Sequence, residues 1–165
     1  KWIKWRQPVT KRANNNEQRR CPWLGSMANI VISSMQGRLS LPSSIRKLLT
    51  EETQMVVVPD ARNEFLSVYT NEAFDVWIDT LFEKRGGFDP NKREHMLLNS
   101  ILRGNATPVT MDSAGRITLP QSLRERAGID KEVTLVGAGS HFDIWDTTRR
   151  ENLLASIDLD ALLYS

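Results

Sequence analysis

The sequence predicts an α+β protein in which a β-rich module occurs twice and helices flank the two copies. Two stretches, 35–50 and 113–128, share a Gly-Arg pair, an alternating strand and a Leu-Pro step into a short basic helix, and they lie 78 positions apart. Within their common ten-residue core, six positions are identical and three more are conservative. After each copy the apolar residues recur with helical rather than strand spacing. A duplicated β module with flanking helices explains these three observations together.

The first copy is predicted to open with a strand, a turn and a second strand. Isoleucine and valine occupy positions 30–32, and such β-branched residues favour a strand. A turn-like segment follows at 33–37. Leu39 and Leu41 then alternate with polar residues, as expected of a strand with one buried face.

A short helix and two further strands complete the first copy. Pro42 suits the first position of a helix, because the amide hydrogen that proline lacks has no partner there. We therefore expect a helix over 43–49. The segments "MVVVP" (55–59) and "FLSVY" (65–69) are rich in β-forming residues, and a polar turn separates them. They predict two strands.

The second copy repeats this plan element by element. Its predicted elements are a polar loop at 112–116, an alternating strand at 116–119, a helix opened by Pro120 and ended by Gly128, and strands at 133–136 and 142–145. Glycine ends a helix well because it adopts the left-handed conformation that closes the last turn. The final turn is two residues shorter than its counterpart in the first copy.

Two helices are predicted between the copies. The first covers 71–85 and ends at Gly86-Gly87, and its apolar stripe is expected to pack on the core or on another subunit. That stripe consists of Phe74, Trp77, Ile78, Leu81 and Phe82. The second begins after Asp89-Pro90, with His95 on its surface. Its apolar face consists of Leu97, Leu98, Ile101 and Leu102.

These elements divide the chain into five segments. They are a basic N-terminal extension (1–27), a first module (28–73), a helical pair (74–105), a second module (106–149) and a single C-terminal helix (150–165). Thr148 and Glu151 have the spacing of a capping box and predict the start of that last helix. The first 26 residues carry seven Lys and Arg against Glu17 alone, whereas the whole chain has a net charge of +2. The folded part is therefore mildly acidic.

The N-terminal extension is predicted to lie outside the fold. It has no sustained helix or strand period, and its polar run buries too little apolar surface to order itself. "GSM" at 25–27 is typical of a junction added ahead of an initiator Met27, and a translated upstream extension is the alternative. A basic arm that adds non-specific affinity for DNA is the functional interpretation of the same segment.

Composition excludes several function classes. No apolar run approaches the ~20 residues of a transmembrane helix, which predicts a soluble protein without membrane partners. Cys21 is the only cysteine, so an internal disulfide framework is excluded and a reducing, cytoplasmic setting is expected. The two histidines are His95 and His141, and His141 is expected in a hairpin turn. Neither is spaced from Cys21 as the ligands of a metal site are. Since no nucleophile–base pair or phosphate loop is recognisable either, we predict a non-enzyme without a cofactor.

The loop that precedes each Gly-Arg strand contains the residues with functional chemistry. In the second copy it has the spacing Asp112-x-x-x-Arg116 with Gly115 before the arginine. Glycine adopts a positive φ, so the chain can turn sharply there. The aspartate can accept hydrogen bonds from turn amides or pair with the guanidinium and fix its direction. An arginine held in this way suits bidentate binding of guanine O6 and N7, or of a phosphate.

The candidate DNA-binding residues come from both loops and from the helix that follows each of them. They are Ser34, Gly37, Arg38, Arg46, Asp112, Gly115, Arg116 and Arg124. For the loop arginines, an internal salt bridge that pins the turn is the structural alternative. For the helix arginines, a solvated helix face is the expected role, with phosphate contact as the functional alternative.

The stretch "DSAGRITLPQSLRERAGIDKEVTLVGAGSHFDIWD" (112–146) resembles the second half of proteins of the MraZ family. The resemblance spans about 28–160 and depends on the duplicated Gly-Arg-x-x-Leu-Pro element together with the terminal "FDIW". It implies two AbrB-like (SpoVT-AbrB) modules with a swapped-hairpin topology in one compact, barrel-like β unit. It also implies an Asp-x-x-x-Arg motif in each module. The first copy departs from this motif, because Ser34 stands where the family usually has aspartate.

The MraZ resemblance further implies a transcriptional regulator that binds double-stranded DNA through the arginines of both loops. The expected target is a set of direct repeats in the promoter of its own gene cluster, the division and cell-wall cluster. The expected assembly is a homo-oligomeric ring, an octamer or a dodecamer, in the cytoplasm and associated with the nucleoid. An AbrB-type antitoxin or another protein-interaction module is the alternative. That class usually has one module and a disordered tail, whereas this chain has two modules and a C-terminus of helical pattern.

Overall fold

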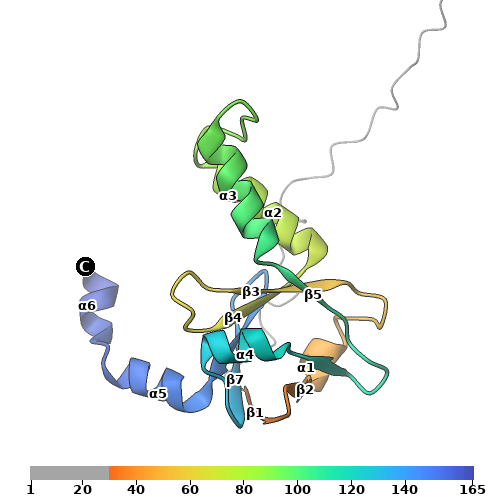
Figure 1. Cartoon of the computed structure of the whole chain (residues 1–165). Coiled ribbons are helices and arrows are strands. Elements are labelled where there is room, and N and C mark those ends of the chain that lie inside the picture. The colour runs from red at the N-terminus through yellow and green to blue at the C-terminus, as the bar shows by residue number, and fades with distance from the viewer. Residues whose placement is uncertain (1–29) are drawn as a thin grey trace, which may run out of the picture.

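The structure, a computed structural model, describes residues 30–165, and the predicted extension (1–27) lies outside the described residues. The strands of this range are β1 (Ile30–Met35), β2 (Arg38–Ser40), β3 (Met55–Pro59), β4 (Leu66–Thr70), β5 (Thr107–Val109), β6 (Arg116–Thr118), β7 (Glu132–Gly137) and β8 (Phe142–Asp146) (Figure 1). Its helices are α1 (Ser43–Arg46), α2 (Asn71–Glu83), α3 (Arg93–Gly104), α4 (Gln121–Ala127), α5 (Thr147–Ala155) and α6 (Leu159–Tyr164). None of these helices is long and apolar enough to cross a lipid bilayer.

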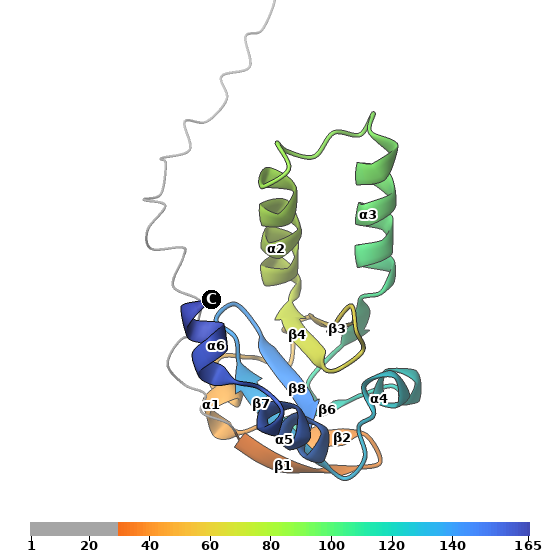
Figure 2. The same cartoon turned by 90° about the vertical axis from the view of Figure 1, so that its left-hand side faces the viewer.

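The eight strands form one antiparallel sheet that curls into an almost closed barrel. The strand order is β5-β3-β4-β8-β7-β1-β2-β6. The second loop brings the two edge strands, β5 and β6, together, since the amide of Asp112 donates a hydrogen bond to the carbonyl oxygen of Arg116 at 2.8 Å. Figures 1 and 2 show the curled sheet with the helices outside it. The predicted α+β class with a barrel-like β unit is confirmed.

The two sequence copies exchange strands within this sheet. β1, the first strand of copy one, pairs with β7 of copy two, with Ile32 opposite Val133. β5, the first strand of copy two, pairs in return with β3 of copy one, with Val57 opposite Thr107. The equivalent strands β2 and β6 pair with each other, as do β4 and β8. The copies are thus intertwined with approximate two-fold symmetry, which is the swapped topology that the family resemblance implied.

Both copies contribute to one hydrophobic core inside the barrel. Alternate strand residues point inward, and Leu39 and its counterpart Ile117 are completely buried there. The helices α1 and α4 add Ile45 and Leu123, which are also equivalent positions of the two copies. Burying one such side chain stabilises a protein by roughly 1.5–3 kcal/mol. Because the core is shared, neither copy retains it without the other.

The helices α2 and α3 form a hairpin that stands on the sheet (Figure 2). One stripe of α2 packs into a second hydrophobic cluster, as the helical spacing predicted. Its fully buried members are Phe74, Ile78 and Phe82. After α2, Gly86 and Gly87 have φ of 88° and 95°, a left-handed conformation that ends the helix and turns the chain.

The helix α3 differs from its prediction in two respects. His95, expected on the helix surface, is buried, and its Nδ1 accepts a hydrogen bond from the amide of Asp89 at 3.0 Å. The imidazole thus provides a hydrogen-bond acceptor for a backbone amide of the loop that leads into α3. The sequence pattern did not indicate this contact. Leu97 and Ile101 were expected on a packed face but are 50% and 58% exposed. The reason is that α3 contacts α2 along a narrow stripe only.

Helix ends also differ from the sequence-based expectation. α1 stops at Arg46 rather than at position 49, because the following residues form tight turns. The C-terminal segment forms two helices, α5 and α6, instead of one. The capping-box prediction was wrong in position, because the N-cap of α5 is Asp146 rather than Thr148. The Oδ1 atom of Asp146 accepts a hydrogen bond from the Arg149 amide at 2.9 Å.

Candidate nucleic-acid interface

The two Gly-Arg strands lie side by side as a β2–β6 ribbon. Its antiparallel register pairs Arg38 with Thr118, Leu39 with Ile117, and Ser40 with Arg116. The central pair is buried completely, so the flanking positions face outward. Arg38 and Arg116 stand at diagonal positions of this outer face and, together with Ser40, line one shallow depression. Strand exchange therefore joins two loops that are 78 residues apart in the sequence into a single surface.

The second loop holds Arg116 through the carboxylate of Asp112. Oδ1 accepts hydrogen bonds from the amides of Ala114 and Arg116 at 2.9 Å each, and Oδ2 accepts one from Arg116 Nε, also at 2.9 Å. Gly115 makes the turn possible with φ of 74°. The hydrogen bond from the Arg116 amide, followed by those of its side chain, keeps the pKa of the Asp112 carboxyl below its ordinary value. The terminal guanidinium nitrogens have no partner among residues 30–165.

The first loop turns differently from the second and has no carboxylate at the corresponding position. β1 extends further than predicted, so the turn is confined to Gln36 and Gly37, with φ of 53° and 82°. Ser34 occupies the position of Asp112, but its Oγ is buried and has no hydrogen-bond partner within the described range. Arg38 is exposed, and its guanidinium has no partner among the described residues. The two arginines of the ribbon therefore differ: a carboxylate holds Arg116, whereas Arg38 has no partner among the described residues.

The helix arginines have a role that the sequence did not show: each one packs on the loop of the other copy. Arg124 of α4 lies against Gly37, where an added Cβ would be 2.7 Å from its Nε. Arg46 of α1 lies against Gly115 in the same way, and an added Cβ would collide with its Cδ. The identity of these positions in both copies was the available signal, but only the exchanged topology shows which surface each arginine contacts.

The chemistry of the ribbon suits a ligand with two adjacent hydrogen-bond acceptors, either a guanine edge or a phosphate. A guanidinium presents its N–H donors in a fixed fork that matches two adjacent acceptors, such as guanine O6 and N7 or two phosphate oxygens. Two such groups at neighbouring positions face solvent from one edge of the barrel. Within residues 30–165, no group of three or more His, Cys, Asp or Glu side chains is placed to hold a metal ion.

Comparisons with known proteins point to one family. The family model described as "MraZ protein, putative antitoxin-like" matches residues 102–161. The chain is also similar to proteins named "Transcriptional regulator MraZ". The one from Yersinia enterocolitica is 36% identical over 121 residues, which cover 72% of this chain and 77% of the relative. The one from Escherichia coli is 33% identical over 138 residues, 82% of this chain and 88% of the relative.

Proposed function

The chain belongs to the MraZ family of transcriptional regulators, and from this premise we propose that it binds double-stranded DNA through the outer face of the β2–β6 ribbon. In this proposal Arg116 binds a guanine edge in the major groove, with its direction set by Asp112. Arg38 contacts a neighbouring base or phosphate. The named relatives are regulators rather than enzymes, and the proposed function needs no catalytic group.

The observation that carries the proposal is the pairing of both arginines on one solvent-facing ribbon. The internal salt bridge and DNA contact are compatible for Arg116, because Asp112 accepts from Nε and leaves the terminal nitrogens available. An arginine that is already oriented loses less side-chain entropy when it binds. A bidentate contact to guanine then contributes about 1–3 kcal/mol of discrimination against another base.

We further propose an assembly that repeats the ribbon. One ribbon offers two loop arginines, which is a small footprint for specific binding. A homo-oligomeric ring presents many such ribbons, and linked sites gain affinity through effective concentration. In a head-to-tail ring each protomer presents its ribbon in the same orientation relative to the next protomer. Direct repeats in DNA likewise present one site repeatedly in the same orientation. The family resemblance supplies the proposed target, direct repeats in the promoter of the division and cell-wall gene cluster, and the proposed location on the nucleoid.

Fluorescence-anisotropy titration tests this function directly. The probes are the duplex upstream of the chain's own gene and a scrambled duplex of the same length, each titrated at several salt concentrations. We expect Arg116→Ala to weaken binding to the cognate duplex by about 1–3 kcal/mol, or roughly 5- to 150-fold, and to reduce the preference over the scrambled duplex. Affinity should fall steeply with salt, because phosphate contacts release counterions.

Arg62→Ala is the matched control, since Arg62 is an exposed arginine in the turn between β3 and β4, outside the ribbon. It should leave the preference for the cognate duplex unchanged. Equal affinities of the wild-type protein and the Arg38/Arg116 double alanine variant for the cognate duplex would refute the proposed interface.

A protein-interaction module of the antitoxin type is the second candidate, and the description of the matching family model favours it. Co-purification of a small protein at fixed stoichiometry, with no difference between cognate and scrambled duplexes, would support this alternative.

A further inference from the structure

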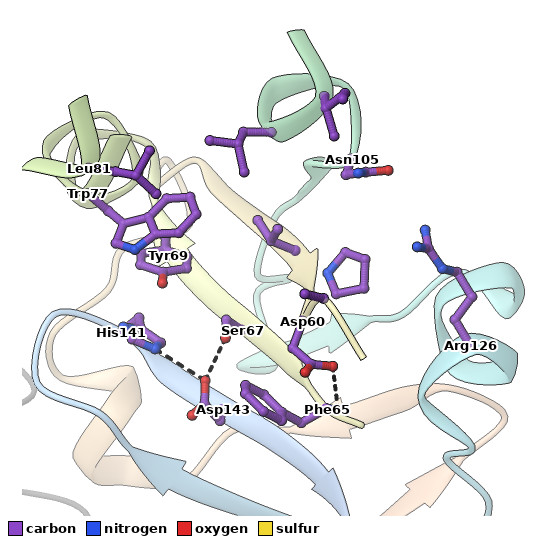
Figure 3. Close-up of a pocket in the computed structure, with 15 residues that line it drawn as sticks. Asp60, Phe65, Ser67, Tyr69, Trp77, Leu81, Asn105, Arg126, His141 and Asp143 are labelled. Carbon is purple, nitrogen blue, oxygen red and sulfur yellow. Dashed lines mark hydrogen bonds and ion pairs between the residues drawn. The ribbon is translucent and has the colours of Figure 1, made fainter. Parts of the chain in front are cut away.

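A cavity of about 550 Å³ lies between the α2–α3 hairpin and the sheet (Figure 3). This volume is within the roughly 300–1,000 Å³ of pockets that bind small molecules. The cavity shares no lining residue with the shallow depression that contains Arg38 and Arg116. It is therefore a candidate binding site separate from the β2–β6 ribbon.

The walls of the cavity combine aliphatic side chains with aromatic rings. The aliphatic side chains of the hairpin are Leu81, Ile101 and Leu102. The aromatic rings are Phe65, Tyr69 and Trp77. Phe65 is held by stacking on Trp145, with ring centroids 4.4 Å apart. Such walls suit a ligand with an apolar body, and the electron-rich faces of aromatic rings attract a positive charge.

The hydroxyl of Tyr69 is a polar group at this cavity that lacks a partner. Tyr69 is only 5% exposed and lines the cavity, and its hydroxyl makes no hydrogen bond within residues 30–165. Stacking on His141, with ring centroids 4.3 Å apart, fixes the position of the ring. Burial, and secondarily the negative charge of Asp143, raises the pKa of Tyr69 to about 12, so the hydroxyl stays uncharged. Because an unpaired buried polar group costs free energy, a ligand that supplies a hydrogen-bond donor is favoured there.

The carboxylate of Asp143 lies near this hydroxyl and is half engaged. Its Oδ1 accepts a hydrogen bond from Ser67 Oγ at 2.7 Å and lies 3.2 Å from His141 Nε2. Its Oδ2 has no partner among the described residues. The carboxylate and the tyrosine hydroxyl thus offer two acceptors on one side of the cavity, and an ammonium group with its three donors is a matching head group.

The overall charge of the lining also favours a cation. Two carboxylates, Asp60 and Asp143, stand against the single guanidinium of Arg126 when the histidine is counted as neutral. Arg126 already donates from Nε to Asn63 Oδ1 at 3.2 Å. Figure 3 shows Arg126 across the cavity from Tyr69, so its charge lies away from the two acceptors. A carboxylate ligand would meet the uncompensated charge of Asp143, whereas an organic cation would balance it.

We propose that this cavity binds a small organic ammonium ion with an apolar body. The ammonium group lies beside Asp143 and the Tyr69 hydroxyl, and the apolar body lies along the aromatic rings and the aliphatic side chains of the hairpin. This is a ligand site in addition to the proposed DNA-binding ribbon, and the two are tested separately.

Saturation-transfer NMR with the full chain tests the charge of the ligand, because it observes the small molecule and works for an assembly of any size. The probes are phenethylamine, phenethyl alcohol and hydrocinnamate, which share a phenylethyl body and carry a cationic, a neutral and an anionic head. We expect phenethylamine to bind about tenfold or more tightly than either of the others. An equal or tighter affinity for the alcohol or for hydrocinnamate overturns the inference, as does the absence of any signal from the amine at millimolar concentration.

Two conservative variants test where the ammonium group lies. Asp143→Asn keeps the shape of the side chain and an oxygen that can accept from Ser67, but it removes the charge. It should weaken binding of phenethylamine about tenfold or more and leave the affinity for the alcohol unchanged. Tyr69→Phe keeps the ring and should weaken binding of the amine roughly two- to tenfold. Wild-type affinity of the Asp143→Asn protein for the amine would overturn the inference.

A third variant tests the site at an exposed position that is not needed for folding. Ile101 lines the cavity and is 58% exposed, so Ile101→Lys should fold and bring a repelling charge to the ligand. It should weaken binding of phenethylamine more than Ile101→Gln, which has similar length without a charge. Val76→Lys is the matched control, because Val76 is 64% exposed on α2 and outside the lining, and it should change nothing. Equal affinities of the Ile101→Lys and Ile101→Gln proteins for the amine would contradict the proposed site.

Discussion

At the scale of single residues, the two loop arginines differ in how firmly they are held. Asp112 accepts three hydrogen bonds, two of them from Arg116. Ser34, at the equivalent position, leaves its hydroxyl without a partner among the described residues, and Arg38 is unpaired there. The two loops thus present one guanidinium that a carboxylate orients and one that is exposed without a partner among the described residues.

The variant Ser34→Asp should orient Arg38 as Arg116 is oriented. The added carboxylate can accept from the turn amides and from the guanidinium, and an exposed pair of this kind contributes about 0.2–1 kcal/mol. We expect the ratio of cognate to scrambled affinity in the anisotropy titration to rise by up to about fivefold. Ser100→Asp, at an exposed position of α3 outside the ribbon, is the control. An unchanged or smaller ratio for Ser34→Asp would show that the orientation of Arg38 does not limit specificity.

The pKa of Asp112 predicts the direction of one pH effect. Because the folded-state pKa is below the ordinary value, the loop gains stability above that ordinary value and loses it as the pH falls through the folded-state pKa. The free energy of unfolding should therefore exceed that of Asp112→Asn at neutral pH, and the difference should shrink in acid below about pH 4. Urea unfolding of both proteins between pH 2.5 and 7 measures this. A constant or growing difference in acid would contradict it.

At the scale of elements, each loop is supported by a helix of the other copy. Arg46 and Arg124 pack on Gly115 and Gly37, whose positive φ and close contacts leave no room for a side chain. Two equivalent backbone hydrogen bonds add to this support, from the Leu41 amide to the Gly115 carbonyl at 2.9 Å and from the Leu119 amide to the Gly37 carbonyl at 2.8 Å. The ribbon and the helices therefore form one unit.

Gly115→Ala should destabilise this unit. A left-handed φ costs an L-residue roughly 1–2 kcal/mol, and the collision with Arg46 adds to that. We expect a lower free energy of unfolding in urea, part of which Arg46→Ala restores in the double variant. Gly104→Ala is the control, because Gly104 is helical with nothing within 4 Å of an added Cβ, and it should be neutral or stabilising by up to about 1 kcal/mol. Full additivity of Gly115→Ala and Arg46→Ala would argue against their contact.

At the scale of the whole molecule, strand exchange makes the two copies interdependent. Among the described strands, β1 pairs with β2 over two residues and with β7, about 100 residues away, over four. The core takes equivalent residues from both copies. In each copy, some strands find their hydrogen-bonding partners only in the other copy, and neither copy has a complete core of its own.

Cooperative unfolding of the barrel is the consequence. Val57→Ala, in the first copy, should lower the stability of the whole barrel by about 1–3 kcal/mol, because Val57 is fully buried in the shared core. Amide hydrogen exchange should show equal losses of protection in the slowest-exchanging amides of β3 and β7. Val76→Ala, at an exposed site of α2, should change neither. Loss of protection in β3 alone would indicate that the copies unfold independently.

By itself, the sequence determined the duplication, the α+β class, most strands and helices, and the two turns that present Arg38 and Arg116. These follow from local chemistry: alternation, helical spacing, and glycine at positive φ. The tertiary structure alone decided that the two loops meet on one ribbon, that Arg46 and Arg124 support the loops of the opposite copy, and that His95 is buried. Such pairings depend on which strands exchange partners, and periodicity within a segment contains no information about its partner in space.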